Sequence, residues 1–331
     1  MTSPAEEIAE RLAKACVRHL DWAVTIEGVR RLAGGASQET WSFDAVLEGG
    51  TTPLILRRNQ RGYGHTLPSA TEFALLRAAH AGTVPVPEAL FVLDERDGLG
   101  QGYVMRRAEG EAIPRRILRD DPFATARDRM TAQLGHILAD IHRLDLGAVP
   151  DFPRLPPGTT AAAAQRDQYR AIMDGIGEPH PTFELALRWL TEHEPPPLAP
   201  TLVHGDFRLG NFLVGPTGIQ AILDWELAHE GDPAEDLGWL CVPSWRFGNE
   251  ARVVGGFGDL EDLLAAYTAA GGAPIDRQRV EYWVVFGTLK WGVICEVQAF
   301  THRSGLARSV ELAAIGRRVC ETEWDLLQLM T

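Results

Sequence analysis

Three polar side chains in residues 201–226 have the types and spacing that phosphoryl transfer requires. The segment reads TLVHGDFRLGNFLVGPTGIQAILDWE and contains a carboxylate at Asp206, an amide at Asn211 and a second carboxylate at Asp224. Transfer of a terminal phosphoryl group needs a carboxylate that orients the attacking hydroxyl and oxygen ligands for a metal ion. The segment therefore predicts a magnesium phosphoryl-transfer site.

The spacing of these residues is that of a kinase catalytic loop. Asp206 and Asn211 are as far apart as the Asp and Asn of H-R-D-x-x-x-x-N, with Gly205 in place of the Arg. Asp224 then stands where kinases have the Asp of Asp-Phe-Gly, and Trp225 follows it. Either short triplet alone is an ordinary turn sequence, so only the whole set in this order is specific.

The segment resembles the aminoglycoside phosphotransferase and choline kinase family of kinase-like small-molecule phosphotransferases. It is most similar to the branch found fused to acyl-CoA dehydrogenases, which shares the forms His-Gly-Asp-Phe-Arg and Asp-Trp-Glu. The motifs that carry the resemblance are His204-Gly205-Asp206, Asn211, Asp224-Trp225-Glu226, Gly231-Asp232-Pro233 and Asp236-Leu237. The resemblance implies an α+β, protein-kinase-like bilobal fold with an N-terminal antiparallel sheet lobe and a larger, mostly helical C-terminal lobe.

The resemblance also implies catalytic roles for three residues of the loop. Asp206 would accept or orient the proton of the acceptor hydroxyl, which requires an ionised carboxylate. Arg208 stands at the position of a catalytic-loop lysine, where a cation neutralises charge on the transferred group. A surface arginine is the alternative for Arg208. We expect His204 to orient the loop rather than to act as a base.

Two further roles follow from the same resemblance. Asn211 and Asp224 would hold Mg²⁺ against the phosphates of ATP or GTP, the expected co-substrate. Asp236 would brace the catalytic loop through its backbone or through His204.

A glycine pair near the N-terminus is a candidate phosphate-binding loop. Gly34, Gly35 and Ser37 lie between two predicted strands, at residues 24–32 and 41–47. Glycines let backbone amides approach a phosphate closely, although a plain hairpin turn would look the same.

The third predicted strand ends in two arginines. Arg57 stands where V-A-I-K places the kinase lysine, and Arg58 follows it, so either could bind the phosphates. Glu72 matches the glutamate that pairs with this base in the family, but it could equally close a capping box that begins at Ser69. By resemblance, Met105 belongs to the hinge that meets the adenine, although a core position explains it equally well.

Composition limits the functional class. The chain has 331 residues, 45% of them hydrophobic and 23% charged, and a formal net charge of −13. This charge argues against nucleic-acid partners, which need clustered basic residues. The N-terminal sequence is not that of a signal peptide and no apolar run reaches membrane-spanning length, so we expect a cytoplasmic protein without a membrane contact. The four cysteines show no metal-binding spacing.

The predicted organisation is a nucleotide-binding lobe at 1–107 and a catalytic and acceptor-binding lobe at 108–331, as a monomer or homodimer. Helical periodicity and caps predict a helix at 4–20 in the first lobe. In the second lobe they predict helices at 128–144, 161–174, 182–193, 259–270, 276–303 and 306–330.

The acceptor is open between several classes of small molecule. Carboxylates and aromatics suit a polycationic sugar or a quaternary amine, whereas the fused branch points to hydroxyacyl substrates. The candidates for the acceptor pocket, each of which is more often a core or surface residue, are Glu226, Glu230, Trp239, Trp245, Glu281, Trp283, Trp291 and Glu296.

Two other functional classes compete with a kinase. A non-catalytic nucleotide-binding scaffold would usually lack the base or a metal ligand, and both are present here. A two-metal phosphohydrolase would need more His and Asp clusters than the chain contains.

Overall fold

The computed structural model describes residues 4–32, 38–59 and 67–331, which fall into two compact units. The first unit contains residues 1–110, 144–152 and 220–227, and the second contains 111–143, 153–219 and 228–331. Two short segments of the predicted second lobe, 108–331, thus belong to the first unit. The assignment of nucleotide binding and catalysis to separate lobes stays a prediction.

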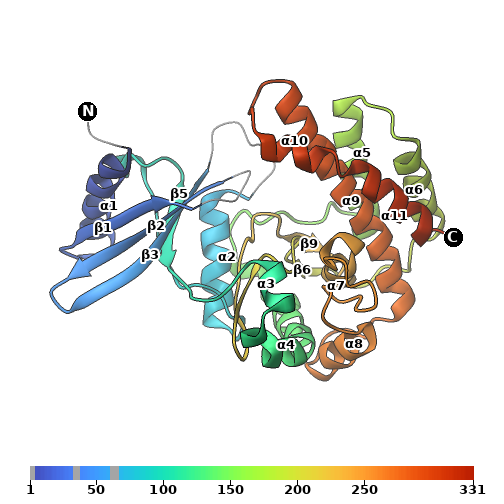
Figure 1. Ribbon diagram of the computed structural model, residues 1–331, viewed down its shortest axis with the longest axis horizontal. Coiled ribbons are helices and arrows are strands. Elements are labelled where there is room, and N and C mark those ends of the chain that lie inside the picture. Colours follow the sequence, from blue (N-terminus) through green and yellow to red (C-terminus); the bar gives the residue numbers. More distant parts are fainter. Residues whose placement is uncertain (1–3, 33–37, 60–66) are drawn as a thin grey trace. The chain divides into compact units, whose positions relative to one another are not determined.

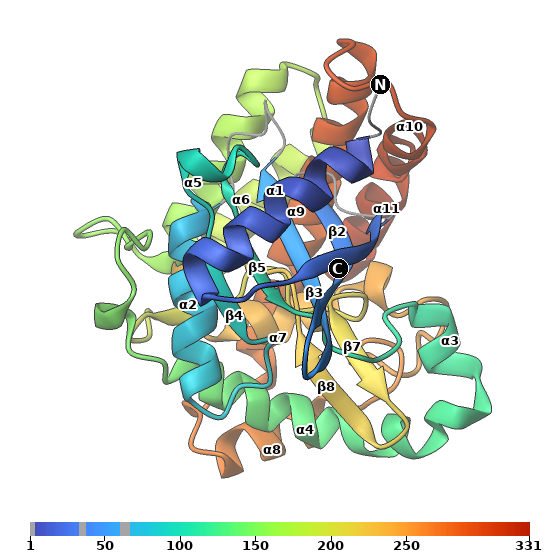
Figure 2. The same cartoon turned by 90° about the vertical axis from the view of Figure 1, so that its left-hand side faces the viewer.

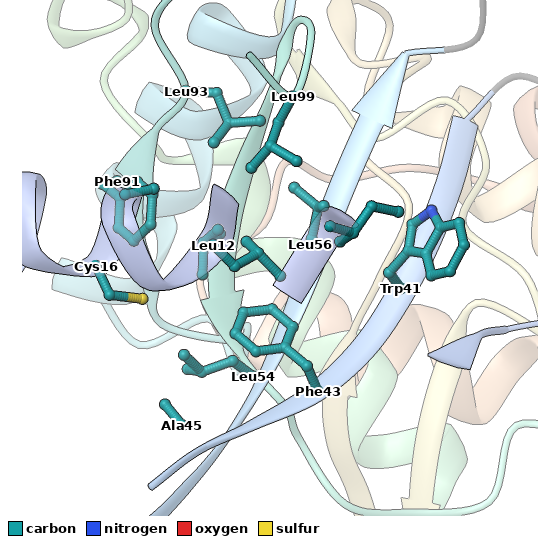
Figure 3. Packing of buried hydrophobic residues seen from close by; sticks show 13 residues of the cluster. Leu12, Cys16, Trp41, Phe43, Ala45, Leu54, Leu56, Phe91, Leu93 and Leu99 are labelled. Atoms are coloured by element: carbon teal, nitrogen blue, oxygen red, sulfur yellow. The ribbon is translucent and has the colours of Figure 1, made fainter. Parts of the chain in front are cut away.

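The first unit is built on an antiparallel sheet of five strands in the order β1-β2-β3-β5-β4. The strands are β1 (Thr25–Arg31), β2 (Gln38–Leu47), β3 (Gly50–Asn59), β4 (Ala89–Val92) and β5 (Gly102–Arg106), and the helices are α1 (Pro4–Leu20) and α2 (Ser69–Ala81). Helix α1 lies against the strands in both views (Figures 1 and 2). Its apolar face joins Phe43, Leu54 and Leu56 in one buried cluster (Figure 3).

The alternation of side chains along β3 decides where its two arginines point. Successive strand residues face opposite sides of a sheet. Leu54 and Leu56 face the cluster around α1, so Arg57 points to the other face, where it approaches Glu72 of α2. The register pairs Arg57 with Tyr103 of β5.

The second unit is mostly helical. Its helices are α3 (Pro114–Arg119), α4 (Ala124–His142), α5 (Ala161–Ile176), α6 (Pro181–Glu192), α7 (Ala234–Cys241), α8 (Leu260–Ala269), α9 (Arg277–Arg303), α10 (Val310–Gly316) and α11 (Val319–Leu329). Helix α9 is the longest and packs against α5, α6, α7, α10 and α11 (Figure 1). Because neighbours surround it, its buried residues are not confined to one narrow stripe.

Short strands frame the loop that contains Asp206. Strand β6 (Thr201–Val203) pairs with β9 (His229–Gly231), and the loop runs from β6 to β7 (Phe212–Gly215). A tight turn then leads to β8 (Gly218–Ile222), within which the chain passes from the second unit into the first. The loop is therefore held at both ends by regular structure.

Two expectations about helices were wrong. The helix predicted at 306–330 is two helices, α10 and α11, because Ser309 accepts a hydrogen bond from Glu311 N and starts α10, while Gly316 ends it. The capping box at Ser69 does not form: Pro68 occupies the N-cap of α2, and the Ser69 hydroxyl donates to Asn59 instead.

The predicted α+β architecture is confirmed, since the first unit carries an antiparallel sheet and the second is mostly helical. In the part of the chain that the structure describes, no helix is long and apolar enough to cross a membrane.

Candidate active site

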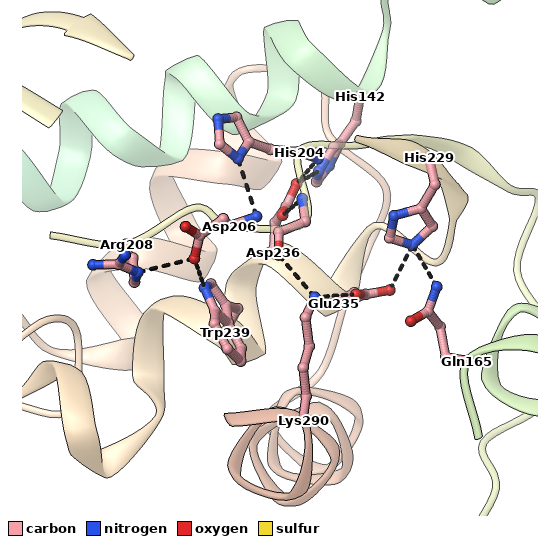
Figure 4. Close-up of polar contacts among 11 residues, drawn as sticks. His142, Gln165, His204, Asp206, Arg208, His229, Glu235, Asp236, Trp239 and Lys290 are labelled. Carbon is pink, nitrogen blue, oxygen red and sulfur yellow. Dashed lines mark hydrogen bonds and ion pairs between the residues drawn. The ribbon is translucent and has the colours of Figure 1, made fainter. Parts of the chain in front are cut away.

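Asp206 is fixed mainly through one of its two carboxylate oxygens (Figure 4). Its Oδ1 accepts hydrogen bonds from Arg208 Nε at 2.9 Å and from Trp239 Nε1 at 2.8 Å. Among the described residues, Asn211 Nδ2 is the donor to Oδ2, at 2.5 Å. A carboxylate oxygen accepts about two hydrogen bonds, so Oδ2 retains room for the hydroxyl of an acceptor.

The backbone before Asp206 is braced by a buried carboxylate. Asp236 accepts hydrogen bonds from His204 N at 2.8 Å and from Gly205 N at 2.9 Å, which confirms the brace inferred from the sequence. His142 contacts the same carboxylate at 3.2 Å. Burial acts to raise the pKa of Asp236, but the contact with His142 and the backbone hydrogen bond from His204 lower it, and the net shift is downward. Asp236 therefore carries a negative charge near neutral pH.

His204 orients the loop from the inside. It is fully buried, and its Nδ1 accepts the backbone hydrogen bond of Asp206 at 3.1 Å. A nitrogen that accepts from a backbone amide carries no proton of its own. The orienting role expected for His204 fits this geometry better than a role as a base.

Arg208 is packed against an aromatic ring rather than extended into solvent. Its guanidinium carbon lies 4.6 Å from the centre of the Trp245 ring, and Nε donates to Asp206. A guanidinium has five N–H donors, so its terminal nitrogens could still meet a transferred phosphoryl group. The packing disfavours the alternative of an unattached surface arginine.

The amide of Asn211 suits a role as a metal ligand. Both hydrogen bonds that its side chain makes with described residues use Nδ2, one to the Asp206 carbonyl at 3.0 Å and one to its carboxylate. This orientation leaves Asn211 Oδ1 for a cation. Amide and carboxylate oxygens are the ligands that Mg²⁺ prefers, so the chemistry of Asn211 and that of Asp224 each suit a magnesium ligand.

In the first unit, Arg57 and not Arg58 joins the candidate phosphate-binding residues. Arg57 donates to Asp224 Oδ1 and to Gln38 Oε1, both at 2.7 Å. Burial acts to lower the pKa of Arg57, but Tyr103 and Asp224 raise it, and the net shift is upward. Arg58 instead pairs with Glu39 at 2.6 Å.

Glu72 faces the interior and does not cap its helix. It is fully buried, and it accepts hydrogen bonds from Gln38 Nε2 at 3.1 Å and from Tyr103 OH at 3.0 Å. Arg57 NH2 lies 3.8 Å from it. Of the two possibilities open in the sequence, the structure supports proximity to Arg57.

The remaining nucleotide-binding candidates are less defined. Gly34, Gly35 and Ser37 lie outside the described residues. Met105 is buried on β5 opposite Ile55, which is compatible with both of its expected roles. Asp224 has a positive φ of 68°, a backbone conformation that a non-glycine residue adopts at a cost, often at functional sites.

The family can now be established. The model of the phosphotransferase enzyme family, abbreviated APH, matches residues 28–283. The chain belongs to this family. The resemblance found in the sequence is thereby confirmed.

Curated relatives of this phosphotransferase-family chain are larger proteins. Mouse acyl-CoA dehydrogenase family member 10 is 26% identical over 305 residues, which cover 82% of this chain and 27% of that protein. The chain spans about a quarter of the length of the curated relatives it matches first.

Solved structures share the fold across nearly the whole chain. A protein from Ralstonia eutropha JMP134 named as an aminoglycoside phosphotransferase has a TM-score of 0.72 at 21% identity, covering 97% of both chains. A thermostable mutant of APH(4)-Ia, in ternary complex with AMP-PNP and hygromycin B, has a TM-score of 0.60 at 16% identity, covering 97% of this chain and 98% of the other. At these identities the likeness shows the fold alone.

Sequence reasoning about this family member missed several polar residues around the two sites. It did not single out Gln38, Tyr103, Glu235 or Lys290, all of which are buried. Lys290 did carry a signal, because it interrupts the apolar run of residues 283–289 on a predicted helix. A charge at such a position is rarely buried without a partner.

The acceptor candidates divide into different environments. Trp239 and Trp245 pack together near Asp206, and Trp291 packs on Trp245. Trp283 is fully buried in the core, where its Cβ lies against Gly238 of α7. Glu281 is exposed, so the helical face that carries it is not one uniform pocket wall.

Proposed function

We propose that this chain is an ATP- or GTP-dependent O-phosphotransferase that transfers the terminal phosphoryl group to a hydroxyl of a small molecule. The observation that carries the proposal is the hydrogen bonding of the Asp206 carboxylate. Three donors hold it, and Oδ2 can accept one further hydrogen bond, from an acceptor hydroxyl. Family membership supports the same reaction class. A cytoplasmic location remains part of this proposal.

The reaction assigns a role to Asp206 and a role to Arg208. The acceptor oxygen bonds to the terminal phosphorus while the bond from that phosphorus to the bridging oxygen breaks, and a nucleoside diphosphate leaves. The hydroxyl proton passes to Asp206 Oδ2. Arg208, beside this carboxylate, offsets negative charge on the transferred group.

The family resemblance also suggests residues for the nucleotide and its metal ion. Arg57 would bind the phosphates, while Asn211 and Asp224 would hold Mg²⁺, which when bound neutralises phosphate charge and orients the transferred group. Met105, Glu72 and the glycine loop at 34–37 complete the proposed nucleotide site.

The acceptor has two candidate classes. An aminoglycoside or a related drug is one, because the solved structures that share the fold include drug phosphotransferases. A hydroxyacyl-CoA or another metabolite is the other, because the curated relatives are named acyl-CoA dehydrogenases.

An acceptor panel tests the proposal. Nucleoside diphosphate release would be measured with ATP and with GTP over aminoglycosides, macrolides, choline-like alcohols and hydroxyacyl-CoAs. We expect one class to stimulate release, and we expect Asp206→Asn to lower kcat by about 10²- to 10⁴-fold because it removes the proton acceptor. Calorimetry should show nearly unchanged affinity for Mg²⁺-nucleotide in this variant.

Two results would reject the proposal. Nucleotide binding without turnover on any acceptor would favour the non-catalytic scaffold. Equal turnover by Asp206→Asn and the parent would exclude the kinase mechanism.

A further inference from the structure

The peptide group between Gly205 and Asp206 is held from both sides. Lys290 Nζ donates to the Gly205 carbonyl at 2.8 Å, and the Asp206 N–H donates to His204 Nδ1 at 3.1 Å. A peptide group is planar, so fixing its oxygen and its nitrogen fixes the position of the Asp206 Cα that follows. Lys290 thus forms a hydrogen bond with the backbone directly before Asp206, the proposed base.

Lys290 is a charged group in the interior of the second unit. It lies on α9, is 2% exposed, and pairs with Glu235 Oε1 at 3.2 Å. Burial acts to lower the pKa of Lys290, but Tyr169, Glu235 and Asp206 raise it, and the net shift is upward, so the ammonium stays charged. Glu235 Oε2 in turn contacts His229 Nε2 at 3.1 Å (Figure 4).

Such a pair is weak evidence for stability. Taking two charges out of water costs as much as their attraction returns, and well-packed apolar residues often do equally well in their place. The pair does have a specific effect here, because it holds the Lys290 ammonium in place. Nζ donates to the Gly205 carbonyl and lies 4.7 Å from the centre of the Trp239 ring.

Trp239 connects this pair to the carboxylate itself. Its indole Nε1 donates to Asp206 Oδ1 at 2.8 Å. By contrast, the buried indole nitrogens of Trp245, Trp283 and Trp291 have no hydrogen-bond partner among the described residues. Trp239 therefore differs from its neighbours by a bond to the proposed base.

We propose that Trp239 and Lys290 are positioning residues for phosphoryl transfer. Trp239 occupies Asp206 Oδ1 so that Oδ2 faces the acceptor hydroxyl, and Lys290 holds both the preceding carbonyl and the Trp239 ring. This inference rests on the proposed function of Asp206. Both side chains are only 2% exposed, so we expect them to act on kcat through Asp206 and not on nucleotide affinity.

The contact can be tested without turnover. The chain has nine tryptophans, and the indole N–H signal of Trp239 can be assigned in a ¹H–¹⁵N spectrum by its loss in Trp239→Phe. We expect Asp206→Ala to shift that signal and to leave the Trp283 signal in place. An unshifted Trp239 signal would overturn the inference.

The positioning role is tested by matched tryptophan variants. Trp239→Phe keeps a ring and removes the donor, whereas Trp283→Phe makes the same change at a core position that donates to no described residue. We expect Trp239→Phe to lower kcat about ten- to a hundredfold with nucleotide Kd within about twofold, as for a misplaced catalytic group. Trp283→Phe should lower Tm without a comparable loss of kcat. An equal loss of kcat in both variants, or none in Trp239→Phe, would contradict the proposal.

The role of Lys290 has to be tested with a variant that leaves no buried charge without its ion-pair partner. Lys290→Met with Glu235→Gln removes both charges, so the folded state should persist with a Tm close to that of the parent. We expect kcat of this double variant to remain at least about tenfold below that of the parent, with unchanged nucleotide Kd. Parental kcat in the double variant would show that Lys290 only neutralises Glu235. If the parent turns over no acceptor while the Trp239 signal shifts as expected, the proposed function fails and the contact stands.

Discussion

At the scale of single residues, Gln38 lies between Arg57 and Glu72 and forms a hydrogen bond with each of them. Arg57 Nε donates to Gln38 Oε1 at 2.7 Å, and Gln38 Nε2 donates to Glu72 at 3.1 Å. The direct approach of Arg57 to Glu72 is longer, at 3.8 Å. The Gln38 amide accepts a hydrogen bond from Arg57 and donates one to Glu72. The position of the Arg57 side chain therefore depends on that of Glu72.

This arrangement predicts a loss of nucleotide affinity in Gln38→Leu. The change leaves Arg57 Nε and Glu72 without their shared partner, and an unsatisfied buried group costs about 1–3 kcal/mol. We expect Kd for Mg²⁺-ATP, measured by calorimetry, to rise about tenfold.

A double-mutant cycle shows whether Gln38 acts through Arg57. In an Arg57→Ala background, Gln38→Leu should change Kd by less than about twofold, since residues that act as one unit are not additive. Glu39→Gln is the control, because Glu39 is adjacent on β2 but pairs with Arg58. Additive losses, or an equal loss in Glu39→Gln, would show that Arg57 is not the phosphate-binding arginine.

At the scale of elements, close helix contacts hold the second unit together. A Cβ added at Gly135 of α4 would lie 2.7 Å from Ala266 Cβ and 2.8 Å from Tyr267 N on α8. The second of these atoms belongs to the backbone and cannot rotate away. Gly175 of α5 is the opposite case, because nothing lies within 4 Å of its added Cβ.

These two glycines predict opposite effects of the same substitution. Gly135→Ala should destabilise the protein by about 1–3 kcal/mol, since overpacking forces the helices apart. Gly175→Ala should stabilise it by about 0.5–1 kcal/mol, because alanine costs less entropy in a helix. Urea unfolding measures both changes, and an equal sign for the two would contradict the packing of α4 against α8.

The elements that sequence reasoning placed best are those with local signals. Helix α9 was expected at 276–303 and lies at Arg277–Arg303, because Asp276 caps it and its apolar run is long. The break between α10 and α11 was missed; it falls at Gly316, the last residue of α10, which packs closely against Ala299 of α9. Contacts between distant segments have no signal in the local pattern.

The same distinction explains the candidate site. The chemistry of the Asp206 loop and the Asp236 brace could be read from motifs of fixed spacing, whereas the bond from Trp239 and the support from Lys290 could not. Lys290 is 84 residues from Asp206 in the sequence, and only the packing of α9 brings it to the loop. The pairing of Glu72 with Gln38 likewise depends on how α2 meets the sheet.

At the scale of the whole molecule, the net charge of −13 sets up a long-range negative field. Such a field slows the approach of ligands of the same sign and speeds the approach of cations. The range of the field depends on salt, since the Debye length falls from about 30 Å at 0.01 M to about 8 Å at 0.15 M. Ionic strength therefore separates the acceptor classes by their charge.

We expect kcat/KM for Mg²⁺-ATP, an anion, to rise up to a few-fold as NaCl increases from about 0.01 to 0.15 M, because screening removes the repulsion. A cationic aminoglycoside acceptor should show the reverse, and a hydroxyacyl-CoA should behave like the nucleotide. Initial rates in a salt series, with an uncharged alcohol acceptor as the reference, measure these slopes. A steep fall of kcat/KM for the nucleotide with increasing salt would contradict this expectation. It would mean that local cations such as Arg57 and Arg208 outweigh the overall negative charge, so that the sign of the salt effect does not report the charge of the acceptor.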